Sequence, residues 1–381
     1  MECSEKPVWT ERTKEELFSL KLEAPKEGVF RKVLENWDSV AKPLDGLGVF
    51  ETLTAKIGAI LGTEQIDIAK KAVLIFCADN GVVEEGVSQS GQEVTLAVAK
   101  KMGQQASSVG KMARIVGADT IPVDIGISCA DFVEGVLDRK VRFGTRNFAK
   151  EPAMTEAEAL QAVFTGIGLV GQCKKHGYRM AATGEMGIGN TTTSSALAAA
   201  LLQEEPDRLT GRGAGLNDEG LSAKRRVIKE ALKRYGLLAQ RGDGTEDAED
   251  ARAFALRALC CVGGLDIAGL AGVCIGGALY HVPVVLDGVI SMTAALCAER
   301  MVPGTKDYLI GSHMGKEPAI RQLADELGVT TVIDGRMALG EGTGAVMMFG
   351  LLDTALSLYT EKMTFEDISI GRYERFEKEP V

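Results

Sequence analysis

Glycines and polar side chains are concentrated in the segment Gly184–Ser195 (GEMGIGNTTTSS). The segment follows a short apolar run and precedes a helical pattern, and its three glycines allow the backbone to approach a ligand closely. N–H groups at the start of a helix bind anions, and Asn190 and Thr191 suit the N-cap position. We therefore favour phosphate binding over a capped helix after a tight turn. The Gly-Lys-Ser/Thr element of an ATPase loop is absent from this segment.

Glu341 is a second candidate for chemistry, because it lies between two glycines in Leu339–Gly344 (LGEGTG), directly before an apolar helical pattern. A carboxylate removed from water has a raised pKa and is a better general base. A Glu that is simply favoured by the dipole at a helix N-terminus would fit the same position. From spacing alone, both interpretations remain open.

Strands and helices alternate along the part of the chain that must position these segments. Long helical patterns, such as Glu156–Cys173, Thr192–Gln203, Gly220–Tyr235 and Ala251–Leu259, separate short apolar runs. This alternation predicts an α/β fold with a parallel sheet and helices on both faces. The runs predicted as strands are Ala72–Ala78, Thr120–Ile125, Arg179–Thr183, Val282–Leu286, Tyr308–Gly311 and Thr330–Ile333.

Polar residues and glycines follow most of these predicted strands. In open parallel sheets, ligands bind at the carboxyl ends of the strands. Asp79 follows the first run, Glu185 the third, Asp287 the fourth and Ser312 the fifth, and Glu341 comes shortly after the last. The sequence therefore predicts one site at one edge of the sheet.

Both chain ends lack the alternation and suggest a second unit. Glu11–Leu20 and Gly28–Ala41 have the pattern of amphipathic helices, and Ala345–Thr360 that of a strong helix followed by a charged tail. We predict a small helical subdomain from residues 1–45 and 355–381 beside an α/β domain of residues 46–354. The polar stretch Arg241–Asp250 is predicted to be a solvated loop.

Bulk properties exclude several partners. A net charge of −10 over 381 residues contains no basic footprint for nucleic acid or an anionic membrane, but it allows nucleotides. The apolar run between Asp266 and His281 is too short to span a membrane. The eight cysteines form no C-x-x-C pair and Met1–Lys14 has no apolar core, so we expect reduced thiols and a cytoplasmic protein.

Two further patterns have simple interpretations. Gly166–Gly171 matches G-x-G-x-x-G, but it follows a helical pattern instead of a strand, so we expect close helix packing and not a dinucleotide site. The three histidines are dispersed, which gives no indication of a metal site, and His313 is expected to be structural.

The sequence resembles the nicotinate-nucleotide–dimethylbenzimidazole phosphoribosyltransferase family, which makes the lower-ligand nucleotide of cobamides. The motifs GEMGIGNTT and LGEGTGA are the most specific. Asn80 stands where many members have His, so base preference would differ if that side chain contacts the base. The matching segments run in family order: Cys77–Thr95, Gly184–Leu197, Gly211–Asn217 with Lys224, Val262–Gly272, Pro283–Ala298, Ser312–Pro318 and Leu339–Ala345.

The resemblance implies a doubly wound, Rossmann-like sheet, a small helical domain, a homodimer, and neither a metal nor a cofactor. It places Glu341 on the general base and Glu185 on a second active-site carboxylate. Further positions around the substrates are Gly187, Gly189, Asn190, Thr191 and Lys224 for the mononucleotide, Asp287, Gly288 and Ser291 for its ribose and nicotinate, Gly340, and Ser88 and Gln92 for the base pocket.

The implied reaction moves ribose 5-phosphate from nicotinate mononucleotide to an aromatic base, 5,6-dimethylbenzimidazole in this family. The leaving pyridinium needs no general acid, whereas the attacking ring must lose its N–H proton, so one general base suffices. Another acceptor, such as a purine, another benzimidazole or a phenol, is an alternative. A non-catalytic nucleotide-binding regulator is a third interpretation, although it would not need Glu185, Lys224 and Glu341 together.

Overall fold

The computed structural model describes residues 12–238 and 250–375. Its centre is a six-stranded sheet in the order β3-β2-β1-β4-β5-β6, and all of the strand pairs are parallel. The order reverses between β1 and β4, so the sheet is doubly wound, as the resemblance implies. The strands are β1 Lys71–Ala78, β2 Ala118–Gly126, β3 Leu137–Asp138, β4 Met180–Met186, β5 Val284–Leu286 and β6 Leu309–Gly311.

Five of the six predicted strands are confirmed, and the prediction for Thr330–Ile333 is wrong. That segment forms only an isolated parallel bridge between Ile333 and His313. Its neighbour β6 is three residues long, and the N–H groups of Val332 and Ile333 both donate to the Ser312 carbonyl just beyond it. The segment therefore meets the chain only beyond the end of β6, where a single bridge forms in place of a ladder. The two-residue β3 carries too little pattern to be predicted from the sequence.

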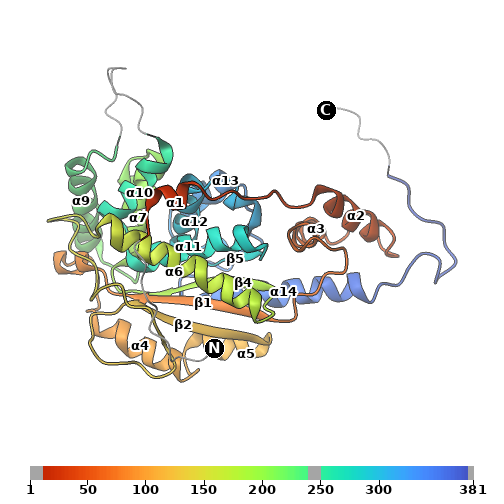
Figure 1. Cartoon of the computed structure of the whole chain (residues 1–381). Helices are drawn as coiled ribbons and strands as arrows, with labels where there is room; N and C mark the ends of the chain where they lie inside the picture. The colour runs from red at the N-terminus through yellow and green to blue at the C-terminus, as the bar shows by residue number, and fades with distance from the viewer. Residues whose placement is uncertain (1–11, 239–249, 376–381) are drawn as a thin grey trace, which may run out of the picture.

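Both faces of the sheet are covered, which explains why the strands are almost continuously apolar. On β1, Leu74 and Phe76 face a core shared with α6 (Glu156–Lys175) and α11 (Leu265–Tyr280). Val73 and Ile75 face the opposite core, which includes side chains of α4 (Glu93–Gly103), α5 (Ser108–Ile115) and α14 (Thr343–Thr360). Figure 1 shows these two helical layers on either side of the sheet.

The glycines of Gly166–Gly171 serve helix packing, as predicted. A Cβ on Gly166 would lie 2.1 Å from the Gly269 carbonyl oxygen, and one on Gly272 would lie 2.0 Å from the Val163 carbonyl oxygen. The backbones of α6 and α11 therefore touch, and only glycine allows that approach.

The helices near the two chain ends pack in two different places. In α1 (Lys14–Phe18), Leu17 packs into the main core. By contrast, α2 (Glu27–Asp38) packs on α3 (Val49–Leu61), and both lie beside the carboxyl end of α14 (Figure 1). The rings of Trp37 and Tyr359 are 5.2 Å apart. The boundaries of the predicted helical subdomain, at residues 45 and 355, stay a prediction. Residues 1–11 and 376–381 of that subdomain lie outside the described residues.

The remaining helices connect and cover the strands. Within the described residues, no helix is both long and apolar enough to cross a membrane. The predicted loop Arg241–Asp250 lies outside the described residues, apart from Asp250, which caps a helix. The remaining helices that connect and cover the strands are η1 Gly81–Glu85, α7 Asn190–Leu202, α8 Pro206–Leu209, α9 Asp218–Arg234, α10 Ala251–Val262, α12 Val289–Met301, η2 Thr305–Tyr308 and α13 Ile320–Leu327.

Candidate active site

A cavity of about 290 Å³ opens at the carboxyl ends of β4, β5 and β6. It lies beside the point where the strand order reverses, which is where doubly wound sheets bind ligands. The volume suits one small ligand or the reacting part of a larger one. Nine of the predicted site residues line it: Glu185, Gly187, Asn190, Thr191, Asp287, Gly288, Ser291, Gly340 and Glu341.

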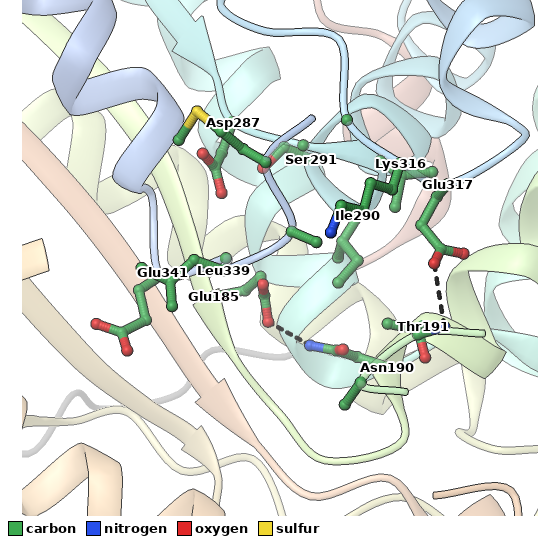
Figure 2. Close-up of a pocket in the computed structure, with 18 of the residues that line it drawn as sticks. Glu185, Asn190, Thr191, Asp287, Ile290, Ser291, Lys316, Glu317, Leu339 and Glu341 are labelled. Atoms are coloured by element: carbon green, nitrogen blue, oxygen red, sulfur yellow. Dashed lines mark hydrogen bonds between the residues drawn. The ribbon is translucent and has the colours of Figure 1, made fainter. Parts of the chain in front are cut away.

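Glu185 is a deeply buried carboxylate in this cavity. It is part of β4, which runs to Met186, beyond the predicted end at Thr183. Its carboxylate accepts a hydrogen bond from the Asn190 side-chain amide (Figure 2). Burial, reinforced by the negative charge of Asp266, raises the pKa of Glu185 to about 8.

Asn190 does not occupy the N-cap position that the sequence suggested. The N-cap of α7 is Gly189, whose φ of +95° suits glycine, and Asn190 is the first residue of the helix. Its amide is used elsewhere, because it donates to Glu185 and, at 3.1 Å, to Asp266. The glycine turn therefore presents Asn190 to two carboxylates instead of to its own helix.

Glu341 lies on the loop before α14, in the left-handed conformation with φ of +63°. Its carboxylate accepts a hydrogen bond of 3.1 Å from the Val109 N–H in the first turn of α5. In Figure 2 the Glu341 carboxylate points away from Glu185. The side chain is only partly buried, so the predicted dry surroundings are incomplete in this state. A helix N-terminus does hold this Glu, but the helix is α5 and not α14.

The N-terminus of α14 is occupied by Asp287 instead. This buried carboxylate accepts from the N–H groups of Gly342 (3.2 Å), Gly344 (2.8 Å) and Ala345 (3.3 Å). It thereby ties the Glu341 loop to the end of β5. Burial raises the pKa of Asp287, while His313 at 4.0 Å and these N–H groups oppose the rise. His313 also lines the cavity, in addition to its structural contacts.

Lys224 is a buried cation directly behind Thr191, which lines another part of the cavity wall. It is fully buried on α9, and its Nζ donates to Thr191 Oγ1 at 3.0 Å. Burial lowers the pKa of Lys224 to about 8, against the opposing charge of Glu317. Glu317 in turn accepts from the Gly213 N–H at 3.0 Å. Lys224 stands behind Thr191 and does not itself line the cavity.

Three other predicted residues lie outside the cavity lining, namely Gly189, Ser88 and Gln92. The Gln92 amide donates to the Asn80 carbonyl at 3.3 Å. Asn80 is fully buried beneath the Gly187–Gly189 turn, where its amide donates to Ile188 O at 3.4 Å. Asn80 is also absent from the cavity lining, so this structure does not bring it to the space where a base would contact it.

Several site residues were not singled out from the sequence. Lys316 and Glu317 belong to the matching segment Ser312–Pro318, so a charged pair in a family-matching segment was the available signal. Asp266 lies in another matching segment, Val262–Gly272, where it is a lone charge within an apolar helix pattern. The apolar lining residues were not singled out either, because an apolar side chain is equally typical of a buried core, even within a matching segment. They are Val98, Met186, Ile188, Ile290, Met337 and Leu339.

Comparisons with known proteins identify the family of the chain. A family model described as Phosphoribosyltransferase matches residues 22–370, which include both glycine-rich segments of the site. The nicotinate-nucleotide–dimethylbenzimidazole phosphoribosyltransferase of Acetivibrio thermocellus is 42% identical over 337 residues, which are 88% of this chain and 92% of the relative. The enzyme of the same name from Clostridium tetani is 40% identical over 344 residues, or 90% and 91% of the two chains.

Solved structures give the same result. The crystal structure of CobT from Thermus thermophilus superposes with a TM-score of 0.82 at 34% identity, covering 91% of this chain and all of that one. The likeness therefore extends over the sheet and its helical layers as well as over the sequence. The chain is a pentosyl-transferring enzyme and belongs to the nicotinate-nucleotide–dimethylbenzimidazole phosphoribosyltransferase family.

Proposed function

We propose that this enzyme transfers the 5-phosphoribosyl group of nicotinate mononucleotide to 5,6-dimethylbenzimidazole, giving α-ribazole 5′-phosphate and nicotinate for cobamide lower-ligand assembly. One observation carries the proposal. A single cavity has a buried carboxylate, Glu185, at one part of its wall and Thr191, backed by the buried Lys224, at another. The donor carries matching charges, a cationic ring and an anionic phosphate.

The phosphate end of the donor fits the start of α7. Lys224 and Thr191 supply a buried cation and a hydroxyl there, and Lys316 extends into the cavity (Figure 2). The first turn of the helix adds favourable dipole charge. Glu317 must release the Gly213 N–H, or turn aside, when a second anion enters. On the other side of the ribose, the buried Ser291 hydroxyl has no hydrogen-bond partner among the described residues, so it is free to bind a sugar hydroxyl.

The acceptor base fits the apolar part of the lining. Val98, Met186 and Leu339 lie there, and the Glu341 loop borders the same space. A flat aromatic ring gains contact area on such side chains. Its ring nitrogen then lies on the side from which Glu341 can approach.

The reaction requires one bond to break and one to form at C1′. The attacking ring nitrogen forms the new bond, and the pyridine nitrogen keeps the electron pair of the old one. Glu341 accepts the N–H proton of the attacking ring after turning from the Val109 N–H toward the cavity. Glu185 stabilises the positive charge at the reacting centre. Direct displacement converts the β-linkage of the donor into the α-linkage of the product.

The active form is a homodimer in the cytoplasm in this proposal. An exposed apolar stripe on α14, formed by Met347, Leu351 and Leu358, lies beside α5, which bears the exposed Ile115. An apolar face of this kind is typical of a protein interface. None of the described cysteines forms a disulfide bond, in keeping with a reducing compartment. Light scattering of the purified protein measures the oligomeric state.

The decisive assay mixes the enzyme with nicotinate mononucleotide and dimethylbenzimidazole and measures free nicotinate and the α-linked product. Release of nicotinate that depends on the acceptor supports the proposal. Tight binding of the mononucleotide without turnover would instead support a regulator. Competition among dimethylbenzimidazole, another benzimidazole, a purine and a phenol at equal concentration then ranks the acceptors by product formed.

A further inference from the structure

Glu185 and Asp266 are two buried carboxylates joined by one amide. The Asn190 Nδ2 group donates one hydrogen to each of them, with a distance of 3.1 Å to Asp266 Oδ2. Asp266 is fully buried at the start of α11, where its other oxygen accepts from the Ile267 N–H at 3.0 Å. The fit is tight, because a Cβ on Gly187 would lie 2.5 Å from Asp266 Oδ2. Asp266 does not line the cavity, whereas Glu185 does.

No cation balances this pair. Within residues 12–238 and 250–375, neither carboxylate forms an ion pair with a lysine, arginine or histidine. The other titratable groups that act on Glu185 are also acids, namely Asp287 beyond β5 and Glu341 before α14, and the thiol of Cys77 lies near the pair on β1. His313 stands beside Asp287, and Lys224 is bonded to Thr191.

Ionising two adjacent buried carboxylates together without a cation is costly, since each loses its hydration and repels the other. We propose that Asp266 is a positioning residue that makes the pair hold one proton in the free enzyme, and that the cationic ring of the donor replaces this proton. The proton leaves the Glu185 carboxyl for the solvent, and the resulting carboxylate faces the donor. This inference rests on the proposed function, because it requires a cationic donor.

The electrostatics are in keeping with this order of events. Burial raises the pKa of Asp266 to about 6, below that of Glu185 at about 8, so the shared proton resides on Glu185 near neutral pH. The pair therefore carries one negative charge fewer than two free carboxylates until the donor supplies the positive charge.

Calorimetry of donor binding tests the inference directly. Heats measured at pH 7.0 in buffers of different ionisation enthalpy give the number of protons released when nicotinate mononucleotide binds. We expect about one proton from the wild type. Ribose 5-phosphate, which has the sugar and phosphate but no cationic ring, should release almost none, and it corrects for protons exchanged by the phosphate and by Lys224.

Substitutions identify which carboxyl group holds the released proton. Glu185→Gln should abolish the extra release, and Asp266→Asn should reduce it at pH 7.0 and move it to lower pH. Asp266→Ser, which keeps an acceptor for the Ile267 N–H, repeats the test if Asp266→Asn prevents folding. Asp124→Asn is the matched control: Asp124 on β2 is also a buried acid with a raised pKa, and it is bonded to the Ile127 N–H and to Lys140 instead of to the pair. Its proton count should equal that of the wild type.

The outcomes separate the two proposals. Equal proton release for nicotinate mononucleotide and ribose 5-phosphate in the wild type would overturn the inference while turnover of the donor continued. The inference also fails if both Asp266 variants fold and release as many protons as the wild type. Absence of donor binding and turnover would instead overturn the proposed function, and the inference with it.

Discussion

Buried charged groups lie at two places beside the cavity, acids at one and a lysine at the other, and they attract opposite charges. At the end of β4, Glu185 and Asp266 are buried together, and burial raises the pKa of each. Behind Thr191, Lys224 is buried alone, and the same loss of hydration lowers its pKa. One physical cause therefore brings an acid and a base to a pKa of about 8 from opposite directions.

The difference lies in what surrounds each charge. Lys224 has Glu317 within electrostatic reach, so the free enzyme already contains an anion where a phosphate would bind. Among the described residues, the acidic pair accepts hydrogen bonds from neutral groups, namely the Asn190 and Asn80 side chains and the Ile267 N–H, and the charges that act on Glu185 are further acids. We infer that the lysine side exchanges one anion for another on binding, whereas the acidic side gains a cation that it lacked. Four experiments test this contrast between the two sides.

The largest change in activity is expected for Glu341→Gln. This variant distinguishes the carboxylate that accepts a proton in the reaction from the carboxylates that only attract positive charge. Loss of a general base should lower kcat by roughly 10²- to 10⁴-fold with little change in KM for the donor. Steady-state kinetics with both substrates measures this. Glu361→Gln, at the exposed end of α14, is a matched control that should keep full activity. Near-normal turnover of Glu341→Gln, with its melting temperature unchanged, would refute the assignment.

Lys224→Met tests the positively charged side of the cavity. Removal of a buried charge-assisted contact to phosphate costs about 1.5–3 kcal/mol, so KM for nicotinate mononucleotide should rise roughly 10- to 100-fold, with kcat changed much less. Lys229→Met on the same helix is the control, because Lys229 pairs with Asp207 on the surface. Equal KM values in the two variants would remove Lys224 from the donor site.

The pH dependence of kcat/KM for the donor combines both sides. The raised pKa of Glu185 means that it gains a proton as pH falls below about 8, which weakens attraction of the cationic ring. The lowered pKa of Lys224 means that it loses its charge as pH rises above about 8. We expect a maximum near pH 8, with limbs that approach about tenfold per pH unit for one proton each. Lys224→Met should lose the alkaline limb only; retention of both limbs would contradict the assignment.

The weakest change is expected on the acceptor side. Leu339 is 58% exposed at the cavity, so Leu339→Ala removes part of an apolar contact worth about 1 kcal/mol. KM for dimethylbenzimidazole should rise about fivefold, while KM for the donor stays unchanged. Ile370→Ala, an equally exposed apolar residue in the C-terminal segment away from the cavity, provides the control. A change in KM for the donor instead would show that Leu339 lies beside the donor and not beside the acceptor base.

The sequence predicted much of the site because its chemistry is concentrated in short segments. Gly184–Ser195 and Leu339–Gly344 both appear as glycine-rich turns beside polar residues, and both contribute to the cavity lining. The alternation of apolar runs and helical patterns predicted the parallel sheet, and with it the edge at which these turns meet. The strand predicted at Thr330–Ile333 failed because a short apolar run does not reveal how long the neighbouring strand is or where the two segments meet.

Other features depended on which distant residues meet. Asp266 is a lone charge in an apolar helix, and only the packing of α11 against the turn after β4 brings it to Asn190 and Glu185. The partner of Glu341 could not be inferred either, since the Val109 N–H belongs to a helix far earlier in the chain. Ser88 and Gln92 were carried by the resemblance, and in this structure they lie outside the cavity lining.

The amino-acid sequence alone is sufficient to establish the fold class, the glycine turns and the types of groups available for chemistry, because periodicity and backbone freedom are local properties. It does not reveal which carboxylates are buried together, which one faces a helix terminus or how far each is removed from water. Protonation state depends on desolvation and on charges within a few ångströms. Those neighbours come from strands and helices that are remote in the chain, and only folding sets their distances.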